Sequence, residues 1–302
     1  MRALQERRGG AYGRGLLGAL VMAFSLGAAN AIGDTVQAKF ATRGTELQLV
    51  RGMICSLLAV SLIVLFRHRL DRRSLEGLGL PGLQNSLSTF GLGVLLTGGA
   101  AAATFGLGGA QGWVSFGTVS WSALLMFITA NTVVAFLYEA LPEELTLRGY
   151  TYRNLTTTLR RWTASIAVVI LFLVVPAFSS LFAAAIGVSL GGPVRSPSLS
   201  PAGEDPVAYV ILLTIFGSTL IIARVVTGSL WAAIAVHLTV LTINRLVLTY
   251  PEDTGWSVGL TSPDAILLIP AYLVVTAALF LLLARWRVVI SAGETVTQSR
   301  RL

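Results

Sequence analysis

The sequence has few side chains that could form a disulfide or hold a metal ion. Its 302 residues include one cysteine, Cys55, and two histidines, His68 and His237. A single cysteine excludes an intramolecular disulfide and a metal cluster built from cysteines. His68 lies in the basic segment Arg67–Leu70, which is typical of a solvated turn, so we assign it no role. Any site that needs an imidazole inside the protein therefore depends on His237.

Charged residues are also scarce. They make up 12% of the chain, against 54% hydrophobic residues, and the mean hydropathy is +0.76. A soluble domain carries about twice that charged fraction, so the composition predicts a polytopic membrane protein rather than the two soluble domains that length alone suggests. The net charge of +8 does not indicate a nucleic-acid partner. The basic residues flank apolar runs and form no stripe with interleaved aromatic residues.

Eight apolar runs approach the length that a membrane-spanning helix needs. The sequence therefore predicts an all-α fold, a polytopic membrane helix bundle of about eight transmembrane helices, and a multi-pass protein of the cell membrane with the lipid bilayer as its partner. The third run contains Gly93 and Gly98, which predict close helix packing. The fifth contains Pro176, which leaves a kink, a tilt and a break into two helices open. The runs are Leu16–Ile32, Leu47–Phe66, Leu87–Phe105, Trp121–Tyr138, Thr163–Leu190, Val207–Ala223, Gly228–Leu248 and Ala265–Ala284.

The basic residues predict an orientation. Most of the 22 arginines and lysines precede the first run, follow the second and the eighth, or lie between the fourth and the fifth. An even number of spans places these segments on one side, and an excess of basic residues marks the cytoplasmic side. We therefore expect both termini in the cytoplasm and the Pro-, Ser- and Gly-rich segment Gly192–Pro206 outside. Arg245, inside the seventh run, is expected to reach outward or to pair with Glu252 or Asp253.

The chain is predicted to be one domain, since we find no internal repeat. Residues 1–13 and 291–302 are expected to be tails. Residues 14–290 are expected to form a single transmembrane helical domain.

Carboxylates and an arginine gather just after the fourth run. Glu139, Glu143, Glu144 and Arg148 lie at the predicted membrane edge, where each charge costs about 2.5–3.5 kcal/mol on insertion scales. Glu144 precedes Arg148 by four residues, which predicts an ion pair along one helix face. Glu143 is then free to face another group. One paired and one unpaired carboxylate is a common arrangement for a general base, and an interfacial ion-pair cluster without chemistry is the alternative.

Pro142 predicts the local structure of this block. Proline suits the first turn of a helix because no backbone donor is lost there, so we expect a new helix over Leu141–Tyr152. Glu143 and Glu144 would then lie at its N-terminus, where negative charge is favourable.

The block Glu143-Glu144-Leu-Thr-Leu-Arg148-Gly-Tyr resembles the first signature of the CAAX-protease and bacteriocin-processing (CPBP) family of eight-span intramembrane proteases. The run Thr-Gly-Ser-Leu-Trp-Ala-Ala-Ile-Ala-Val-His that ends at His237 is similar to the family's later histidine segment. The resemblance spans Glu139 to His237 and implies a family core at about 119–248. It implies an endopeptidase in which Glu143 activates a water, Glu144 and Arg148 shape the site, and His237 helps to hold the water or a metal. The implied substrate is a peptide or membrane-anchored protein, lipidated in some members.

Two positions depart from the family's pattern. The family has a phenylalanine followed four residues later by histidine, but here Phe172 is followed by Pro176. The family has asparagine or aspartate four residues after its later histidine, but here that residue is Leu241. Asn244 is a candidate substitute, about 10 Å further along the helix axis than His237, and Glu139 is a second accessory candidate.

The metal question stays open at this point. A catalytic zinc usually takes three protein ligands, and His237 and Glu143 would serve as ligands only if a metal binds. The cofactor is therefore unknown, with a divalent metal such as zinc as one candidate.

Three functions remain. The first is an intramembrane endopeptidase of CAAX-protease type, with a water between Glu143 and His237 in a cavity open toward the cytoplasm. The second is a catalytically eroded relative that acts as a membrane binding or scaffold protein, which Pro176 and Leu241 favour. The third is a small transporter with Glu143, Arg148 and His237 as a proton relay, although the paired broken spans of many transporters are missing.

Overall fold

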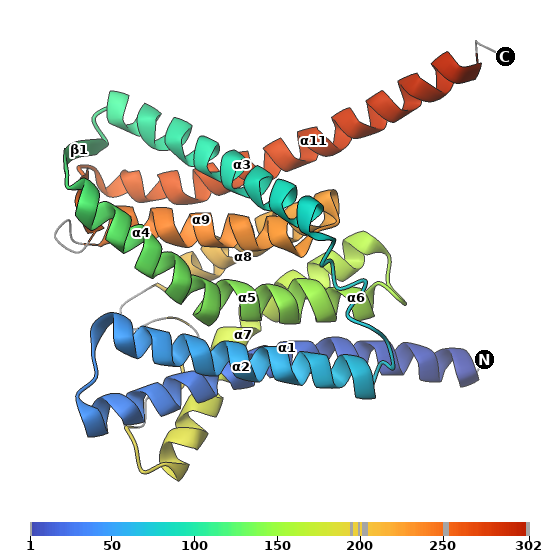
Figure 1. Cartoon of the computed structure of the whole chain (residues 1–302), viewed down its shortest axis with the longest axis horizontal. Helices are drawn as coiled ribbons and strands as arrows, with labels where there is room; N and C mark the ends of the chain where they lie inside the picture. Colours follow the sequence, from blue (N-terminus) through green and yellow to red (C-terminus); the bar gives the residue numbers. More distant parts are fainter. Residues whose placement is uncertain (1, 194–195, 199, 201–204, 250–253, 300–302) are drawn as a thin grey trace.

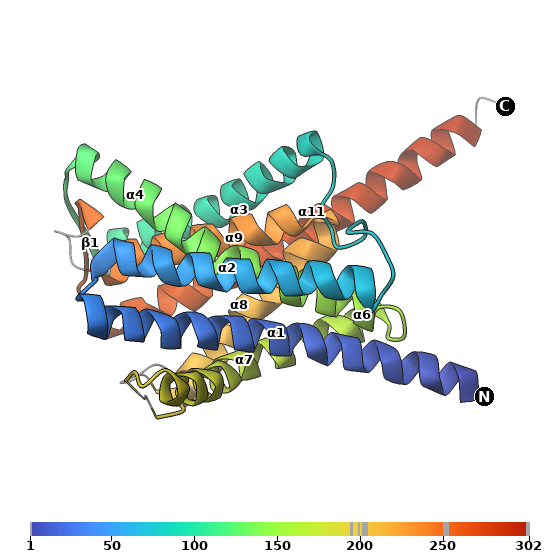
Figure 2. The same ribbon diagram turned by 60° about the horizontal axis from the view of Figure 1, so that its bottom comes forward.

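The computed structural model describes residues 2–193, 196–198, 200, 205–249 and 254–299, with side chains from residue 9 to residue 286 within these ranges. Long helices lie side by side in a bundle (Figures 1 and 2). Eight of the described helices are long and apolar enough to cross a membrane, which confirms the predicted eight-span bundle. They are α1 (Arg2–Phe40), α2 (Gly44–Arg69), α3 (Leu83–Ala110), span four (Trp121–Leu155), α7 (Arg161–Ser189), α8 (Pro206–Thr227), α9 (Leu230–Leu248) and α11 (Leu268–Ser299), the last preceded by the short helix η3 (Pro263–Leu267).

The start of α1 and the end of α11 lie at the same end of the bundle (Figure 1). The α1–α2 connection and the short strands lie at the other end. α1 and α11 include residues 2–13 and 291–299 of the predicted tails. Which end faces the cytoplasm remains a prediction from the arginines. The predicted outer loop Gly192–Pro206 is described only in part, because positions 194–195, 199 and 201–204 lie outside the described residues.

Two prolines lie inside continuous helices. α7 runs unbroken through Pro176, so the fifth span does not split. Span four continues through Pro142, and the predicted helix start at Leu141 is wrong. Proline lacks an N–H and its ring crowds the carbonyl four residues earlier. Here the turn before Pro142 is π-helical, over Phe136–Ala140, and this wider turn lets the helix continue through the proline.

Glu143 and Glu144 therefore lie in the middle of a helix. The expected helix N-terminus beside them is not formed, so the helix-end stabilisation of their charges does not apply. A second π-helical segment, Glu144–Thr151, follows the α-helical residues Leu141–Glu143, and all of its residues are buried. The charged block thus lies inside the bundle rather than at an exposed edge of the membrane.

A short two-stranded sheet, which we did not predict, lies at the end of the bundle away from the termini (Figure 1). β1 (Val114–Val119) follows α3, and β2 (Trp256–Leu260) precedes α11. The strands are antiparallel, and the rings of Phe116 and Trp256 stack across them with centroids 5.9 Å apart. The sheet ties the connection between α3 and span four to the segment between α9 and α11.

The connection between α2 and α3 covers the opposite end. The carbonyl of Leu78 accepts a hydrogen bond from Arg224 of α8 at 3.2 Å, and that of Gly79 accepts one from the backbone of Leu230 at 2.6 Å. Gly79 has φ +93°, and a Cβ there would lie 2.3 Å from Arg224, so the turn requires glycine. This connection therefore packs closely over the junction of α8 and α9.

Candidate active site

Three buried side chains form the centre of the candidate site. Arg148 Nη1 lies 3.3 Å from Glu144 Oε1, as the four-residue spacing predicted, and His237 Nδ1 of α9 lies 3.0 Å from the same oxygen. The exposed fraction is 0% for Glu144 and Arg148 and 2% for His237. Burying a charge is costly unless a partner offsets it. Glu144 therefore offsets the charge of Arg148 and also holds the imidazole of His237.

Arg148 is also held by apolar neighbours. Its guanidinium carbon lies 4.4 Å from the centre of the Phe172 ring on α7, a cation–π contact. Gly217 of α8 leaves room for both groups, because a Cβ there would lie 2.9 Å from the Phe172 ring and 3.5 Å from Arg148 Nη2. Arg148 Nε and Nη2 and Glu144 Oε2 have no hydrogen-bond partner among the described residues. The contact with Glu144 is thus the main compensation for the buried arginine charge.

The hydrogen bond to Glu144 sets the tautomer of His237. When Glu144 is a carboxylate it can only accept hydrogen bonds, and the donor in this contact is then Nδ1–H of His237. The other ring nitrogen, Nε2, then has a free lone pair when the imidazole is neutral. The ring of Phe216 meets His237 edge-on, with centroids 4.9 Å apart and planes at 90°. Together these contacts fix the orientation of the imidazole.

A cavity of about 440 Å³ brings Glu143 and His237 to the same space. Glu143 is half-buried, and its carboxylate has no hydrogen bond or ion pair with any residue that the structure describes. From the spacing we expected Glu143 to lie on a different helix face from the Glu144–Arg148 pair. In the structure Glu143 lines the cavity, and Glu144 and Arg148 do not. The polar or charged side chains of the lining are Asn30, Tyr138, Glu139, Glu143, Ser179, Tyr209, His237 and Asn244.

Most of the cavity lies in the half of the bundle that ends at the sheet. Its lining includes Tyr209 to Phe216 from the first half of α8 and, from α9, His237 near the middle of the helix and Asn244 in its second half. Toward the other end, Leu78, Leu147 and Tyr150 are fully buried. The orientation of the bundle in the membrane is itself a prediction, so the expected opening of the cavity toward the cytoplasm also stays a prediction. The sequence shows the charges but not the apolar packing that fills the end near the termini.

The predicted accessory residue Glu139 forms an ion pair. Its Oε1 lies 2.5 Å from Arg245 Nη2, and Arg245 Nη1 lies 2.6 Å from the amide oxygen of Asn131. Arg245 is therefore paired inside the bundle rather than directed outward. Glu252 and Asp253, the partners that we proposed for it, lie outside the described residues.

The residues that depart from the family's pattern also line the cavity. Pro176 and Leu241 contribute apolar wall where the resemblance leads us to expect polar side chains. The proposed substitute, Asn244, lies in the same lining, but its side-chain oxygen accepts a hydrogen bond at 2.8 Å from the hydroxyl of Tyr272 on α11. Asn244 thus links α9 to α11.

The Glu139–Arg245 pair connects span four, which carries Glu143, to α9, which carries His237. We expect Glu139→Gln or Arg245→Gln to lower stability by about 1.5–3 kcal/mol, as for other hydrogen bonds to charged groups. The double exchange Glu139→Arg with Arg245→Glu should recover part of that loss. Thermal unfolding in detergent measures the effect, with the exposed Glu46→Gln on α2 as the control. A double exchange no more stable than the single variants would contradict this role.

The described residues do not fit a three-ligand catalytic metal. Among them, no group of three or more histidine, cysteine, aspartate or glutamate side chains is arranged to hold an ion. A catalytic zinc usually takes three protein ligands, and Oε1 of Glu144 is already engaged by Arg148 and His237. We therefore derive no chemical step through a metal.

Fold and site together define a helical membrane protein with a polar site buried among its spans. Residues 120–243 match the family model described as Rce1-like, type II CAAX prenyl endopeptidase Rce1-like. This segment is therefore a domain of that peptidase family, as the resemblance of the Glu143–Tyr150 block predicted. No curated protein and no solved structure matches the chain.

Several residues of the site gave little signal in the sequence. In the sequence, Phe172 was noted only because it precedes Pro176 by four residues. In the structure its ring packs against the guanidinium of Arg148. Gly217 lies in an unremarkable apolar run, and its role depends on how closely α7 and α8 approach. Arg245 did stand out as a charge inside an apolar run, but its partner Glu139 is 106 positions away. Long-range pairing of this kind requires the fold.

Proposed function

We propose that the protein is an intramembrane endopeptidase in which Glu143 activates a water for attack on a peptide bond. One observation carries the proposal: Glu143, without a polar partner among the described residues, lines the same cavity as His237. The imidazole of His237 is held from its other side by Glu144, and Glu144 is held by Arg148. A carboxylate and an oriented imidazole that face one cavity are the groups needed to position and deprotonate a water.

The reaction balances with these groups alone. The carboxylate of Glu143 accepts a proton from the water, whose oxygen bonds to the carbonyl carbon of the substrate. As the carbon–nitrogen bond breaks, Glu143 returns that proton to the leaving nitrogen, so that the products are a carboxylic acid and an amine. His237 Nε2 accepts a hydrogen bond from the attacking water. General acid–base catalysis of this type contributes about 10²–10⁴-fold to a rate.

Glu144 and Arg148 act as positioning residues in this scheme. The guanidinium of Arg148 lies beside Glu144, and Glu144 in turn accepts a hydrogen bond from Nδ1 of His237. The lone pair of Nε2 is then available to the water. Phe172 and Phe216 pack against Arg148 and His237 and restrict their movement.

The substrate class follows from the family and from the depth of the cavity. We propose a peptide bond close to a membrane anchor or a lipidated residue, because a soluble folded protein could not reach a site among the spans. The test uses the purified protein in proteoliposomes with two versions of one peptide, one with a farnesylated cysteine near its C-terminus and one with a transmembrane anchor. We expect cleavage of at least one version, with one oxygen atom from ¹⁸O-labelled water in the new carboxylate. Intact peptide in both cases would contradict the proposal.

A second candidate is a non-catalytic membrane receptor for the same kind of peptide. Pro176 favours it, since it lines the cavity where the family's pattern has a histidine. A receptor would hold both peptides without cutting them, and Glu143→Gln would leave the binding unchanged. The cleavage assay and a binding assay on the same proteoliposomes therefore separate the two candidates.

A further inference from the structure

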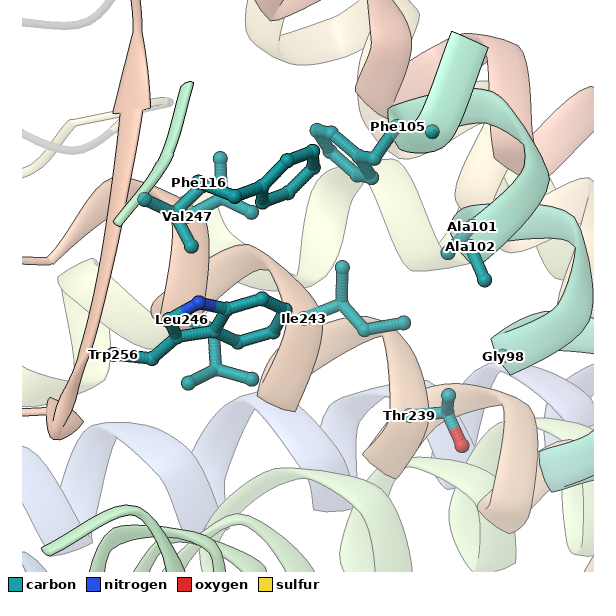
Figure 3. A pocket seen from close by; sticks show the side chains of 12 residues that line it. Gly98, Ala101, Ala102, Phe105, Phe116, Thr239, Ile243, Leu246, Val247 and Trp256 are labelled. Carbon is teal, nitrogen blue, oxygen red and sulfur yellow. The ribbon is translucent and has the colours of Figure 1, made fainter. Parts of the chain in front are cut away.

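A second cavity, of about 520 Å³, lies between α3, α9 and the sheet. Figure 3 shows the rings of Phe116 and Trp256 on one side of it and the small residues Gly98 and Ala101 of α3 on the other. α9 separates this cavity from the one that contains Glu143. Thr239, Ile243 and Val247 belong to the second cavity, whereas His237, Leu241 and Asn244 belong to the first.

The second cavity exists because α3 and α9 diverge. At Gly93 the two helices touch, since a Cβ there would lie 2.7 Å from the Cβ of Ala235. At Gly98 and Gly106 a Cβ would meet nothing within 4 Å. From the sequence we predicted that the glycines of this run allow close helix packing. Gly93 does so, but Gly98 and Gly106 do not. Those toward the sheet leave space between the two helices.

The lining is chemically suited to hydrocarbon. Its one hydroxyl, that of Thr239, already donates to the carbonyl of Ala235 at 2.8 Å. α3, which forms one wall of the cavity, also has an apolar outer face, where Leu95 is 70% and Leu107 66% exposed. In a membrane this face is covered by acyl chains. Tryptophans favour the interface between hydrocarbon and headgroups, so Trp256 of the sheet marks the end at which a lipid headgroup would lie.

We propose that the cavity between α3, α9 and the sheet binds one acyl chain of a membrane phospholipid, with its headgroup at the end formed by β1 and β2. The chain occupies the space beside Gly98 and Gly106 and contacts Ile243 and Val247 on the back of α9. This lipid site does not depend on the chemistry proposed for Glu143, so each proposal can be tested without the other.

Trp256 supplies the readout, because bromine on an acyl chain quenches a nearby indole. The protein is placed in bilayer nanodiscs whose phospholipid is replaced stepwise by the same phospholipid brominated on the acyl carbons near its headgroup, the part of the chain expected beside Trp256. The protein has six tryptophans, so Trp256→Phe identifies the part of the signal that belongs to Trp256. We expect that part to be quenched in a saturable way at a low fraction of brominated lipid.

Two matched variants test the position of the chain. Gly98→Phe fills the cavity from its α3 wall, where the added atoms meet open space. Gly99→Phe adds the same side chain at the next residue, which also has open space but does not line the cavity. We expect Gly98→Phe to remove the saturable quenching and Gly99→Phe to keep it, with equal melting temperatures for the two variants.

Three results would overturn the proposal. Quenching that rises in simple proportion to the brominated fraction, equally in both glycine variants, would show that no chain is retained. A change from dimer to monomer in Gly98→Phe alone, measured by analytical ultracentrifugation in detergent, would assign the cavity to an interface between copies. Displacement of the brominated chain by a farnesylated cysteine ester at equimolar concentration would assign the cavity to the tail of a substrate.

Discussion

Glu143→Gln is expected to reduce peptide cleavage by at least about 10²–10⁴-fold, the contribution of a general base. Glutamine has the size of glutamate but cannot accept the proton of the attacking water at neutral pH. The side chain lines the cavity and forms no ion pair with a described residue, so its replacement should leave the fold intact. The measurement is the initial rate of cleavage in proteoliposomes, with peptide binding measured on the same preparation.

Two further variants make this result specific. Glu143→Asp keeps a carboxylate but withdraws it by one methylene, and we expect a rate between those of the wild type and Glu143→Gln. Glu46→Gln removes an exposed carboxylate of α2 and should cleave at the wild-type rate. Full activity of Glu143→Gln would exclude Glu143 as the base, whatever the identity of the substrate.

Arg148→Met is expected to destabilise the protein by about 3–5 kcal/mol, the cost of removing one partner of a buried ion pair. The carboxylate of Glu144 would remain at 0% exposure with only His237 Nδ1 to offset its charge. The double variant Glu144→Gln with Arg148→Met leaves no buried charge and should be more stable than Arg148→Met alone. Chemical or thermal unfolding in detergent measures each variant.

Arg153→Met is the matched control, because Arg153 lies one turn further along the same span and is exposed. We expect its stability to stay within about 0.5 kcal/mol of the wild type, as for most surface substitutions. If Arg148→Met and Arg153→Met unfolded at the same temperature, the Glu144–Arg148 pair would not hold the site together.

The sequence predicted the parts of this protein that depend on local pattern. Apolar runs of sufficient length predicted eight spans, and the four-residue spacing of Glu144 and Arg148 predicted their ion pair. The helix start that we predicted from Pro142 was wrong, because a π-helical turn lets span four continue through this proline. The partner of Arg245 and the half of the bundle that holds the cavity depend on which helices are neighbours. A single sequence does not show that.

The end of the bundle near the two termini is closed by the connection between α2 and α3 and by the buried residues Leu78, Leu147 and Tyr150. If the protein cuts peptides as proposed, we expect a peptide segment to reach Glu143 from the half of the bundle that ends at the sheet. The fragment that carries the anchor would then stay in that leaflet of the membrane, and the other fragment would enter the aqueous compartment beside it. The packing of the bundle, rather than the chemistry of Glu143, would decide which compartment receives the released product.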